Sequence, residues 1–246
     1  MKQSVFTVAA NERLTDTVYK MTLRGDTTAV TAPGQFVNIK LEGKYLRRPI
    51  SVCDCEKDVL TIVYKVVGKG TAQMAAMNGD ELDILTGLGN GYDTSLSGAE
   101  PLLLGGGVGV PPLYMLAKQL IAEGKRVSVI LGFNTKKEVF YEEEFRAIGA
   151  DVTVTTADGS YGVKGFVTDA MKEKNYSYFY TCGPEPMLKA VYKTSSTSGQ
   201  FSFEERMGCG LGACMGCSCK TITGYKRICK DGPVLQKEEI KWDDYM

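Results

Sequence analysis

Four cysteines near the end of the chain constrain its fold more than any other feature of the sequence. Cys209, Cys214 and Cys217 follow the spacing C-x4-C-x2-C, and Cys229 comes after eleven further residues. The opening three have the spacing of a plant-type iron–sulfur site, in which four thiolates hold a [2Fe–2S] cluster. Glycines lie among them, where a loop around a cluster must bring its backbone N–H groups close to sulfur. These glycines are Gly208, Gly210, Gly212 and Gly216.

Two other uses of the cysteines remain open. Zinc also takes four cysteines, but it usually has two CxxC pairs, and the second half of this motif supplies a single cysteine. Disulfides are the other alternative. Cys219 is a second candidate for the third ligand, although Cys217 completes the expected spacing. The match to plant ferredoxins covers the first three ligands, because their last cysteine lies much further along the chain.

Composition limits the class of protein. The chain has 246 residues, enough for two domains and a small appendage, and its 29 basic and 29 acidic residues argue against nucleic acid or an anionic membrane as a partner. Glycines and prolines interrupt the most apolar stretch, residues 101–120, so we expect no membrane span. Asn11, Glu12 and Arg13 break the apolar run at the start, so we expect no signal peptide. A cytoplasmic protein with protein and small-molecule partners is predicted.

The residue types that are present, and one that is absent, bear on the chemistry. Eight cysteines in a cytoplasmic chain indicate metal or redox chemistry rather than disulfides. Histidine is absent, which excludes histidine-based acid–base catalysis and histidine-ligated metal centres.

The first hundred residues are predicted to form a small antiparallel β-barrel that ends near Gly98. Short segments with alternating polar and apolar residues are separated by turns, as in GQFVNIKLE, where Phe36, Asn38 and Lys40 share one face. A helix over 71–77 interrupts the strands. The six predicted strands are SVFTVAANERL, TVYKMTLRG, GQFVNIKLE, RRPISVCD, VLTIVYKVV and ELDILT.

Two segments of this barrel are candidates for ligand binding. The segment Arg48-Pro49-Ile50-Ser51 places a permanent cation and a hydroxyl on one strand. Between them, Pro49 has no backbone N–H to donate to a neighbouring strand. Gly68-Lys69-Gly70-Thr71 ends a strand and starts a helix, where free N–H groups favour a phosphate. Each signal alone is also typical of an ordinary strand or turn.

After Glu100 the pattern changes to alternating strands and helices, which predicts a parallel sheet with helices on both faces. The predicted strands are PLLLGG, RVSVILGF, DVTVTTA and YSYFYTCG, and the predicted helices cover 110–122, 142–148, 166–172 and 185–193. Ligands bind such sheets at the carboxyl ends of the strands.

Two glycine-containing turns follow strands of this sheet. Gly105, Gly106, Gly107 and Gly109 end the first strand, and Val110 replaces the last glycine of a G-x-G-x-x-G fingerprint. A glycine turn lets the backbone approach a pyrophosphate, although a generic tight turn has the same composition. Cys182-Gly183-Pro184 ends the fourth strand, where Cys182 either is a small buried residue or faces the reactive end of a nucleotide.

The order of these features resembles the ferredoxin reductase superfamily of flavoproteins along essentially the whole chain. Within it, the chain is most similar to the electron-transfer subunits of bacterial class 1B dihydroorotate dehydrogenase. The segments that carry this resemblance are RRPISVCD, GLGNGYD, LLLGGGVGVPPLY, LGFNTKKEVFYEEEF and ERMGCGLGACMGCSC.

The resemblance implies three cofactor sites. FAD would contact Arg48, Pro49, Ile50, Ser51, Val63, Tyr64, Lys65, Gly70 and Thr71. The superfamily commonly has an aromatic residue at the position of Ile50, so stacking on the flavin is not expected from it. NAD would lie against Gly105, Gly106, Gly107, Gly109, Cys182, Gly183 and Pro184. A [2Fe–2S] cluster would be held by Cys209, Cys214, Cys217 and Cys229. The resemblance implies NAD, although Lys136 and Lys137 could together hold the 2′-phosphate of NADP.

The implied function is electron transfer. Electrons from dihydroorotate would pass through the FMN of a catalytic partner subunit, then through the cluster and FAD of this chain to NAD, in a heterotetramer of two chains of each kind. FAD belongs between the cluster and NAD because a flavin can exchange two electrons with nicotinamide and one electron with a cluster. Alternatives are a reductase subunit of another complex, such as a ferredoxin-dependent transhydrogenase or a hydrogenase, and a non-enzymatic zinc-bearing interaction module.

The expected domains are an FAD-binding barrel over residues 1–98, an NAD-binding α/β domain over 99–200 and a cluster-binding domain over 201–246. The acidic and aromatic tail, residues 238–246, is expected to be a solvated end, with docking on a partner as the alternative.

Overall fold

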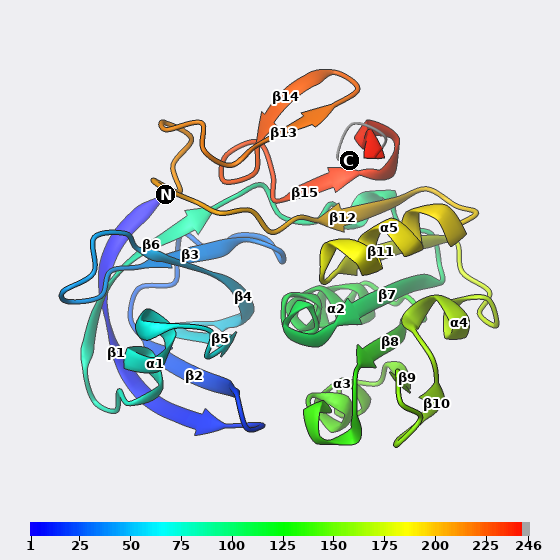
Figure 1. The fold of residues 1–246 in the computed structure, drawn as a ribbon, viewed down its shortest axis with the longest axis horizontal. Helices are drawn as coiled ribbons and strands as arrows, with labels where there is room; N and C mark the ends of the chain where they lie inside the picture. Colours follow the sequence, from blue (N-terminus) through cyan, green and yellow to red (C-terminus); the bar gives the residue numbers. More distant parts are fainter. Residues whose placement is uncertain (243–246) are drawn as a thin grey trace.

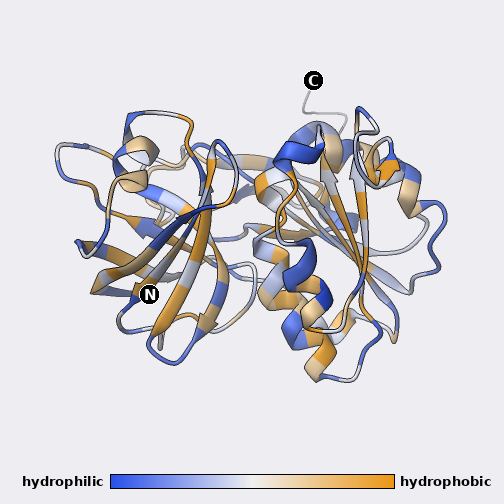
Figure 2. Cartoon of the chain, turned by 90° about the horizontal axis from the view of Figure 1, so that it is seen from below, coloured by the Kyte–Doolittle hydropathy of each residue, from blue (hydrophilic) through white to orange (hydrophobic). Residues whose placement is uncertain are grey.

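The computed structural model describes residues 1–242, and residues 243–246 at the end of the predicted solvated tail lie outside them. A β-barrel forms one half of the molecule and an α/β sheet the other, and the C-terminal segments lie along one side of both (Figure 1). Seen from below, apolar residues follow the strands of both halves (Figure 2). In the described part of the chain, no helix has both the length and the apolar character to cross a membrane.

Six antiparallel strands close into the predicted barrel, in the order β1-β2-β5-β4-β3-β6. Their side chains alternate between the barrel interior and the outside, and each fully buried Leu, Ile or Phe contributes roughly 1.5–3 kcal/mol. The interior holds Phe6, Leu23, Ile39 and Ile62. The strands are β1 (Lys2–Arg13), β2 (Val18–Arg24), β3 (Phe36–Ile39), β4 (Arg48–Glu56), β5 (Val59–Lys65) and β6 (Glu81–Leu88).

The barrel helix α1 covers Lys69–Ala75, so the predicted range of 71–77 was two residues too late. Gly68 is extended and precedes the first turn, and the hydroxyl of Thr71 accepts hydrogen bonds from the backbone N–H groups of Val67 and Gly68. These bonds satisfy donors at the entry to the helix, which therefore begins before Thr71.

The second half is a seven-stranded sheet in the order β10-β9-β8-β7-β11-β12-β15, parallel except for β15. Its strands are β7 (Pro101–Gly106), β8 (Ser128–Phe133), β9 (Asp151–Thr156), β10 (Val163–Lys164), β11 (Tyr178–Cys182), β12 (Gly199–Ser202) and β15 (Val234–Gln236). The predicted strands, β7, β8, β9 and β11, are present, and the expected fold class is confirmed.

Helices cover both faces of the sheet, as the alternating pattern predicted. Leu103 packs with α2 and α3 on one face, whereas Leu102 and Leu104 pack with α4 and α5 on the other. The helices are α2 (Pro112–Ala122), α3 (Glu142–Ala147), α4 (Val167–Met171) and α5 (Glu185–Thr194). Short 3-10 turns are η1 (Thr94–Leu96), η2 (Gly107–Gly109), η3 (Lys136–Glu138) and η4 (Lys237–Glu239).

The end of the chain does not stand apart from the sheet. A hairpin of β13 (Ser218–Thr221) and β14 (Gly224–Arg227) follows the first cysteines, and the chain then returns as β15 beside β12. The sequence analysis did not predict these strands. The proposed boundary between residues 200 and 201 falls inside β12, so the division into domains stays a proposal.

Two apolar side chains in the described part of the tail are buried, whereas Glu238 and Lys241 are exposed. Ile240 and Trp242 lie in the apolar cluster beneath α5, and the Trp242 ring lies 5.6 Å from that of Phe203. The expected solvated end is therefore wrong for these residues, because the return of β15 carries them onto the sheet.

Buried polar contacts join the barrel to the sheet. The Cys53 thiol of β4 donates to the Tyr141 hydroxyl at 3.2 Å, and the Tyr92 hydroxyl donates to the Thr181 carbonyl at 3.2 Å. Lys118 of α2 forms an ion pair with Asp54 of β4 at 2.7 Å. The barrel and the carboxyl ends of the sheet strands are thus held in a fixed relation.

Candidate functional site

The four cysteines are brought together by a loop and a hairpin. Cys209, Cys214 and Cys217 lie in the segment without helix or strand that follows β12, and Cys229 lies just after β14. The β13–β14 hairpin reverses the chain, so that the Ile228 N–H donates to the Cys217 carbonyl at 3.1 Å. This reversal explains how a cysteine twelve residues beyond the third can join the first three.

The cysteine sulfurs form two pairs. Within the first pair, the Cys209 N–H donates to the Cys214 sulfur at 3.5 Å and the Cys214 N–H donates to the Cys209 sulfur at 3.4 Å. Within the second, the Cys229 N–H donates to the Cys217 sulfur at 3.4 Å. The Gly212 N–H links the two halves by donating to the Cys229 sulfur at 3.0 Å. The loop therefore points backbone donors at sulfur.

The two pairs differ in their surroundings. The N–H of Leu211 donates to the Cys209 sulfur at 3.3 Å and lowers the pKa of that thiol to about 6, because it stabilises the thiolate. Burial, reinforced by Cys217, raises the pKa of Cys229 to about 12. Cys214 is exposed, whereas Cys217 and Cys229 are buried. One pair thus faces solvent and the other faces the protein.

This donor set fits a two-iron cluster, in which each iron takes two thiolates. Within residues 1–242, no three Cys, Asp or Glu side chains converge to hold a single metal ion. No disulfide joins any of the eight cysteines within residues 1–242, so the structure gives no support to the disulfide alternative. Cys219 lies on β13 and is buried, whereas Cys217 is the one that accepts the Cys229 N–H. The choice of Cys217 as ligand stays a prediction.

The two candidate segments of the barrel meet in space. A Cβ on Gly70 would lie 2.4 Å from Nε of Arg48, so the Arg48 guanidinium packs directly on the start of α1. Residues 48–51 are all half-buried, whereas Val52 and Cys53 after them are buried. The first residues of β4 are therefore partly open to solvent beside a permanent cation, as a strand that borders an anionic ligand requires.

The other predicted flavin residues do not all face one surface. Val63 belongs to the core shared with the sheet, whereas Tyr64 points into the barrel, where its hydroxyl donates to Asn11 at 3.1 Å. Lys65 is exposed. The Thr71 hydroxyl is occupied by the turn before α1. Tyr64 and Thr71 can therefore contribute backbone groups more readily than side chains.

The two glycine turns lie side by side at the carboxyl ends of β7 and β11. Gly105 is opposite Cys182 in the parallel ladder. A Cβ on Gly109 would lie 2.3 Å from the Cys182 carbonyl oxygen, and one on Gly106 would lie 2.4 Å from the sulfur of Met187. Side chains are excluded from both positions, which brings the two turns into contact and leaves a backbone surface of the kind that a pyrophosphate needs.

Two acidic residues beside these turns were missed in the sequence. Glu204 and Glu205 follow β12 and line a cavity of about 130 Å³ together with Gly183 and Pro184. Burial, with Glu185 nearby, raises the pKa of Glu205. Burial also raises the pKa of Cys182 to about 12, so its thiol stays protonated near neutral pH. The only available signal was the position of the two glutamates just before the cysteine loop.

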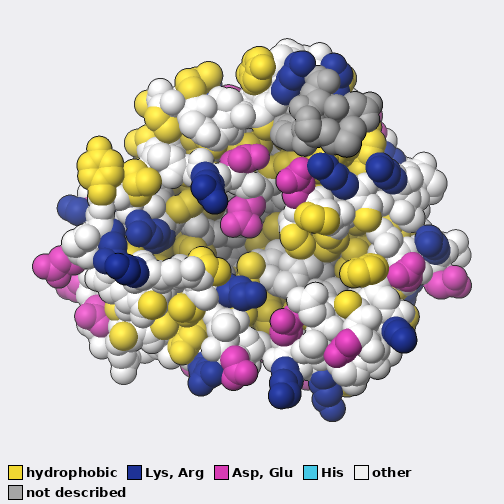
Figure 3. Space-filling model, in the orientation of Figure 1, with side chains coloured by type: hydrophobic (Ala, Val, Ile, Leu, Met, Phe, Trp, Pro, Cys, Tyr) yellow, Lys and Arg dark blue, Asp and Glu magenta, His cyan; other side chains and the backbone are white. Residues whose placement is uncertain are grey.

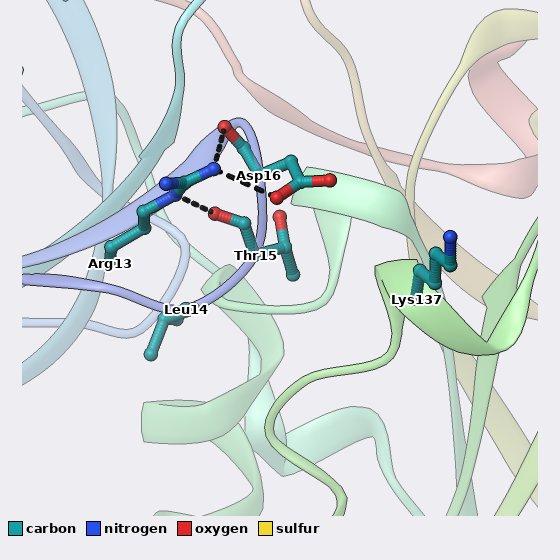
Figure 4. Close-up of a pocket in the computed structure, with 5 residues that line it drawn as sticks. All are labelled: Arg13, Leu14, Thr15, Asp16 and Lys137. Carbon is teal, nitrogen blue, oxygen red and sulfur yellow. Dashed lines mark hydrogen bonds and ion pairs between the residues drawn. The ribbon is translucent and has the colours of Figure 1, made fainter.

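The two lysines considered for NADP do not act as a pair. The ammonium of Lys136 lies over the Tyr161 ring at 5.5 Å. Lys137 instead faces an open groove of about 500 Å³ across from the β1–β2 turn, where Arg13 is bound to Asp16 at 2.8 Å (Figure 4). Because the two cations point to different places, they form no joint site for a 2′-phosphate.

Family models match two parts of the chain. Residues 204–241 match the iron-sulfur cluster binding domain of dihydroorotate dehydrogenase B, and residues 103–193 match the oxidoreductase NAD-binding domain. The first match covers the cysteine loop and hairpin, and the second covers both glycine turns.

Relatives are similar along the whole chain. The electron transfer subunit of dihydroorotate dehydrogenase B (NAD+) from Bacillus pumilus is 45% identical, with 98% of each chain covered. The same subunit from Fusobacterium nucleatum is also 45% identical, over 98% of this chain and 99% of the relative. This chain belongs to the family of dihydroorotate dehydrogenase B electron transfer subunits. The family expected from the sequence is therefore confirmed, and so are an iron–sulfur binding region and an NAD-binding domain.

A solved structure is also similar along nearly the whole chain. The NADH-dependent reduced ferredoxin-NADP oxidoreductase, described in connection with flavin-based electron bifurcation, is 31% identical with a TM-score of 0.88. The match covers 97% of this chain and 90% of that one. This chain thus shares nearly its whole architecture with a chain of that oxidoreductase.

Proposed function

We propose that this protein is the electron-transfer subunit of an NAD-dependent dihydroorotate dehydrogenase of pyrimidine biosynthesis. It would receive electrons from an FMN-containing catalytic subunit that oxidises dihydroorotate, and deliver them to NAD. The observation that carries the proposal is the paired cysteine loop in a chain that is 45% identical to such subunits over 98% of its length.

The residues suggest how the cofactors would be held. Arg48 and the start of α1 would hold the pyrophosphate of FAD, because cation and backbone donors converge there. The turns at Gly109 and Cys182 would hold NAD, and the two cysteine pairs a [2Fe–2S] cluster. A bound flavin supplies the exchange between two-electron and one-electron chemistry. The chain itself supplies binding and orientation, and no general base is required from it.

The partner would dock on the open side of the cysteine loop. Leu211 and Met215 are about half exposed beside the exposed Cys214, so apolar side chains surround the solvent-facing cysteine pair. Elsewhere, on the face shown in Figure 3, basic and acidic side chains are interspersed. We propose a heterotetramer with two copies of each chain, to be measured by sedimentation of the complex. The cytoplasmic location expected from the sequence stays a prediction.

The first test uses the complex isolated with its co-purifying chain. Dihydroorotate added under anaerobic conditions should reduce NAD, and this activity should disappear when the two chains are separated. Flavin released by denaturation should include FAD and FMN in equal amounts. A complex that oxidises NADH with an artificial acceptor but does not respond to dihydroorotate would contradict the proposed substrate.

The similarity to the ferredoxin-NADP oxidoreductase supports a second candidate, a reductase subunit of another electron-transfer complex. NADH-dependent reduction of ferredoxin or NADP by the isolated complex, without dihydroorotate activity, would favour it. A zinc-bearing interaction module is the third, and colour distinguishes it: flavin with a cluster is brown and bleaches with NADH, whereas a zinc protein is colourless.

A further inference from the structure

A single polar side chain lies buried between the barrel and the cysteine loop. Asn38 of β3 is only 2% exposed, although its neighbours Val37 and Ile39 point into the barrel and its own side chain points outward. Phe36, on the same outward face, packs in the cluster that contains Cys217 and Cys229. The outer face of β3 is therefore covered by the cysteine region.

The Asn38 amide contacts the loop at its first cysteine. Its Nδ2 atom donates to the Cys209 carbonyl at 3.4 Å. Gly210 has a φ of +70°, and a Cβ there would lie 2.4 Å from the same Nδ2 atom. Gly210 must therefore lack a side chain for the loop to lie so close to the amide.

Asn38 also lies beside the candidate flavin strand. Its partner across the β3–β4 ladder is Pro49, which has no N–H to donate. The Arg47 guanidinium donates instead to the Asn38 carbonyl at 3.2 Å. One residue thus contacts the cysteine loop through its side chain and the Arg-Pro-Ile-Ser strand through its backbone.

The Asn38 amide is incompletely satisfied in the described chain. Its Oδ1 atom is buried and accepts no hydrogen bond from residues 1–242. Buried acceptors are nearly always paired, and leaving one unpaired costs stability. The unpaired acceptor thus lies in the contact between β3 and the cysteine loop.

We propose that Asn38 is a positioning residue that fixes the first cysteine pair against the flavin-binding strands. The proposal rests on the function proposed above. Through Cys209 and Gly210, Asn38 determines how the loop approaches β3 and β4, and hence the relation of the cluster site to the flavin site. It touches no reacting atom itself.

The test compares Asn38→Leu with Asn11→Leu in the intact complex. Leucine has a similar volume but no hydrogen-bonding atoms, and Asn11 is a barrel asparagine that binds the Met74 carbonyl, away from the cysteine loop. Asn38→Leu should keep its FAD content. It should change the cluster's electron paramagnetic resonance spectrum and midpoint potential and slow cluster reduction by NADH several-fold, whereas Asn11→Leu should leave the spectrum and the midpoint potential of the cluster unchanged.

Gly210→Ala provides an independent measurement if Asn38→Leu does not fold. The added methyl group should displace the amide and perturb the cluster signal, so that Asn38→Ala should change the signal much less in this chain than in the wild-type chain. The unfavourable φ of alanine is present in both variants, so it cancels in the comparison.

The outcomes separate this inference from the proposed function. A wild-type complex without FAD or without a cluster would overturn both. A wild-type complex with both cofactors, in which Asn38→Leu behaves like Asn11→Leu, would overturn only the role of Asn38. The same holds if Asn38→Ala changes the cluster signal equally in the wild-type and Gly210→Ala chains.

Discussion

At the scale of single residues, two glycines in the turn after β7 must be glycine for different physical reasons, which the sequence alone does not distinguish. Gly107 and Gly109 look equivalent in the sequence. In the structure, a Cβ on Gly107 meets nothing within 4 Å, whereas one on Gly109 would lie 2.3 Å from the Cys182 carbonyl oxygen. Gly107 is needed only for its φ of +52°, and Gly109 for space between two backbones.

Gly109→Ala should therefore damage the NAD site more than Gly107→Ala. The first forces two backbone segments apart, at a cost of roughly 1–3 kcal/mol or more, and the second carries a left-handed cost of about 1–2 kcal/mol. Melting temperature and the Kd for NADH measure the two effects. Equal losses of NADH affinity in both variants would contradict the packing argument.

At the scale of elements, the cysteine loop depends on the hairpin that follows it. Arg227 at the end of β14 donates to the Gly212 carbonyl at 2.9 Å and to the Asp231 carboxylate at 3.0 Å. This side chain ties the loop between the first two cysteines to the segment that carries Cys229. The hairpin was invisible in the sequence because TITGYKR is short and its pairing with the rest of the loop is not local.

Arg227→Leu should lower cluster content while the barrel keeps its flavin. The substitution removes the bond to Gly212, so that the two cysteine pairs are no longer held in register. Iron and acid-labile sulfide per chain, measured beside flavin per chain, give the result. Tyr225→Ser on the same strand is the control, because Tyr225 is exposed and should keep its iron. Unchanged iron in Arg227→Leu would show that the hairpin holds its position without this contact.

At the scale of the whole molecule, the barrel contacts both the cysteine loop and the sheet. The cysteine loop lies against β3 of the barrel, and the glycine turns lie at the sheet edge that faces the barrel through the Tyr92–Thr181 contact. The candidate flavin strand β4 lies next to β3 and contacts α2. The candidate flavin strand is thus close to both the cysteine loop and the sheet.

Cys214→Ser should interrupt electron flow between the partner's flavin and NAD while FAD remains bound. Cys214 is the exposed member of the first pair, so its loss leaves the barrel and sheet intact. NADH-driven reduction of orotate by the complex measures the effect, with flavin content measured on the same sample. Cys55→Ser is the matched control, since Cys55 is a free cysteine at the far end of β4. Orotate reduction at the wild-type rate in Cys214→Ser would refute the role of the cluster as the connection.

The sequence predicted those structural elements that depend on residues close together in the chain. The barrel strands and the βαβ series follow from alternation and turn residues, and the two glycine turns follow from the backbone freedom of glycine. The helix limits were displaced by two residues at α1, because the Thr71 hydroxyl binds the turn before it. The tail was assigned to solvent because nothing nearby in the sequence reveals that β15 pairs with β12.

The sequence alone determined the chemistry: four cysteines at iron–sulfur spacing, no histidine, a cation on a proline-containing strand and two glycine turns. The tertiary structure decided how these parts relate. The cysteines became two pairs, Lys136 and Lys137 were separated, and Asn38 was buried instead of lying on a polar face. The reason is physical: side-chain type sets what a residue can bind, whereas burial and partner are set by segments far away in the chain that only folding brings near.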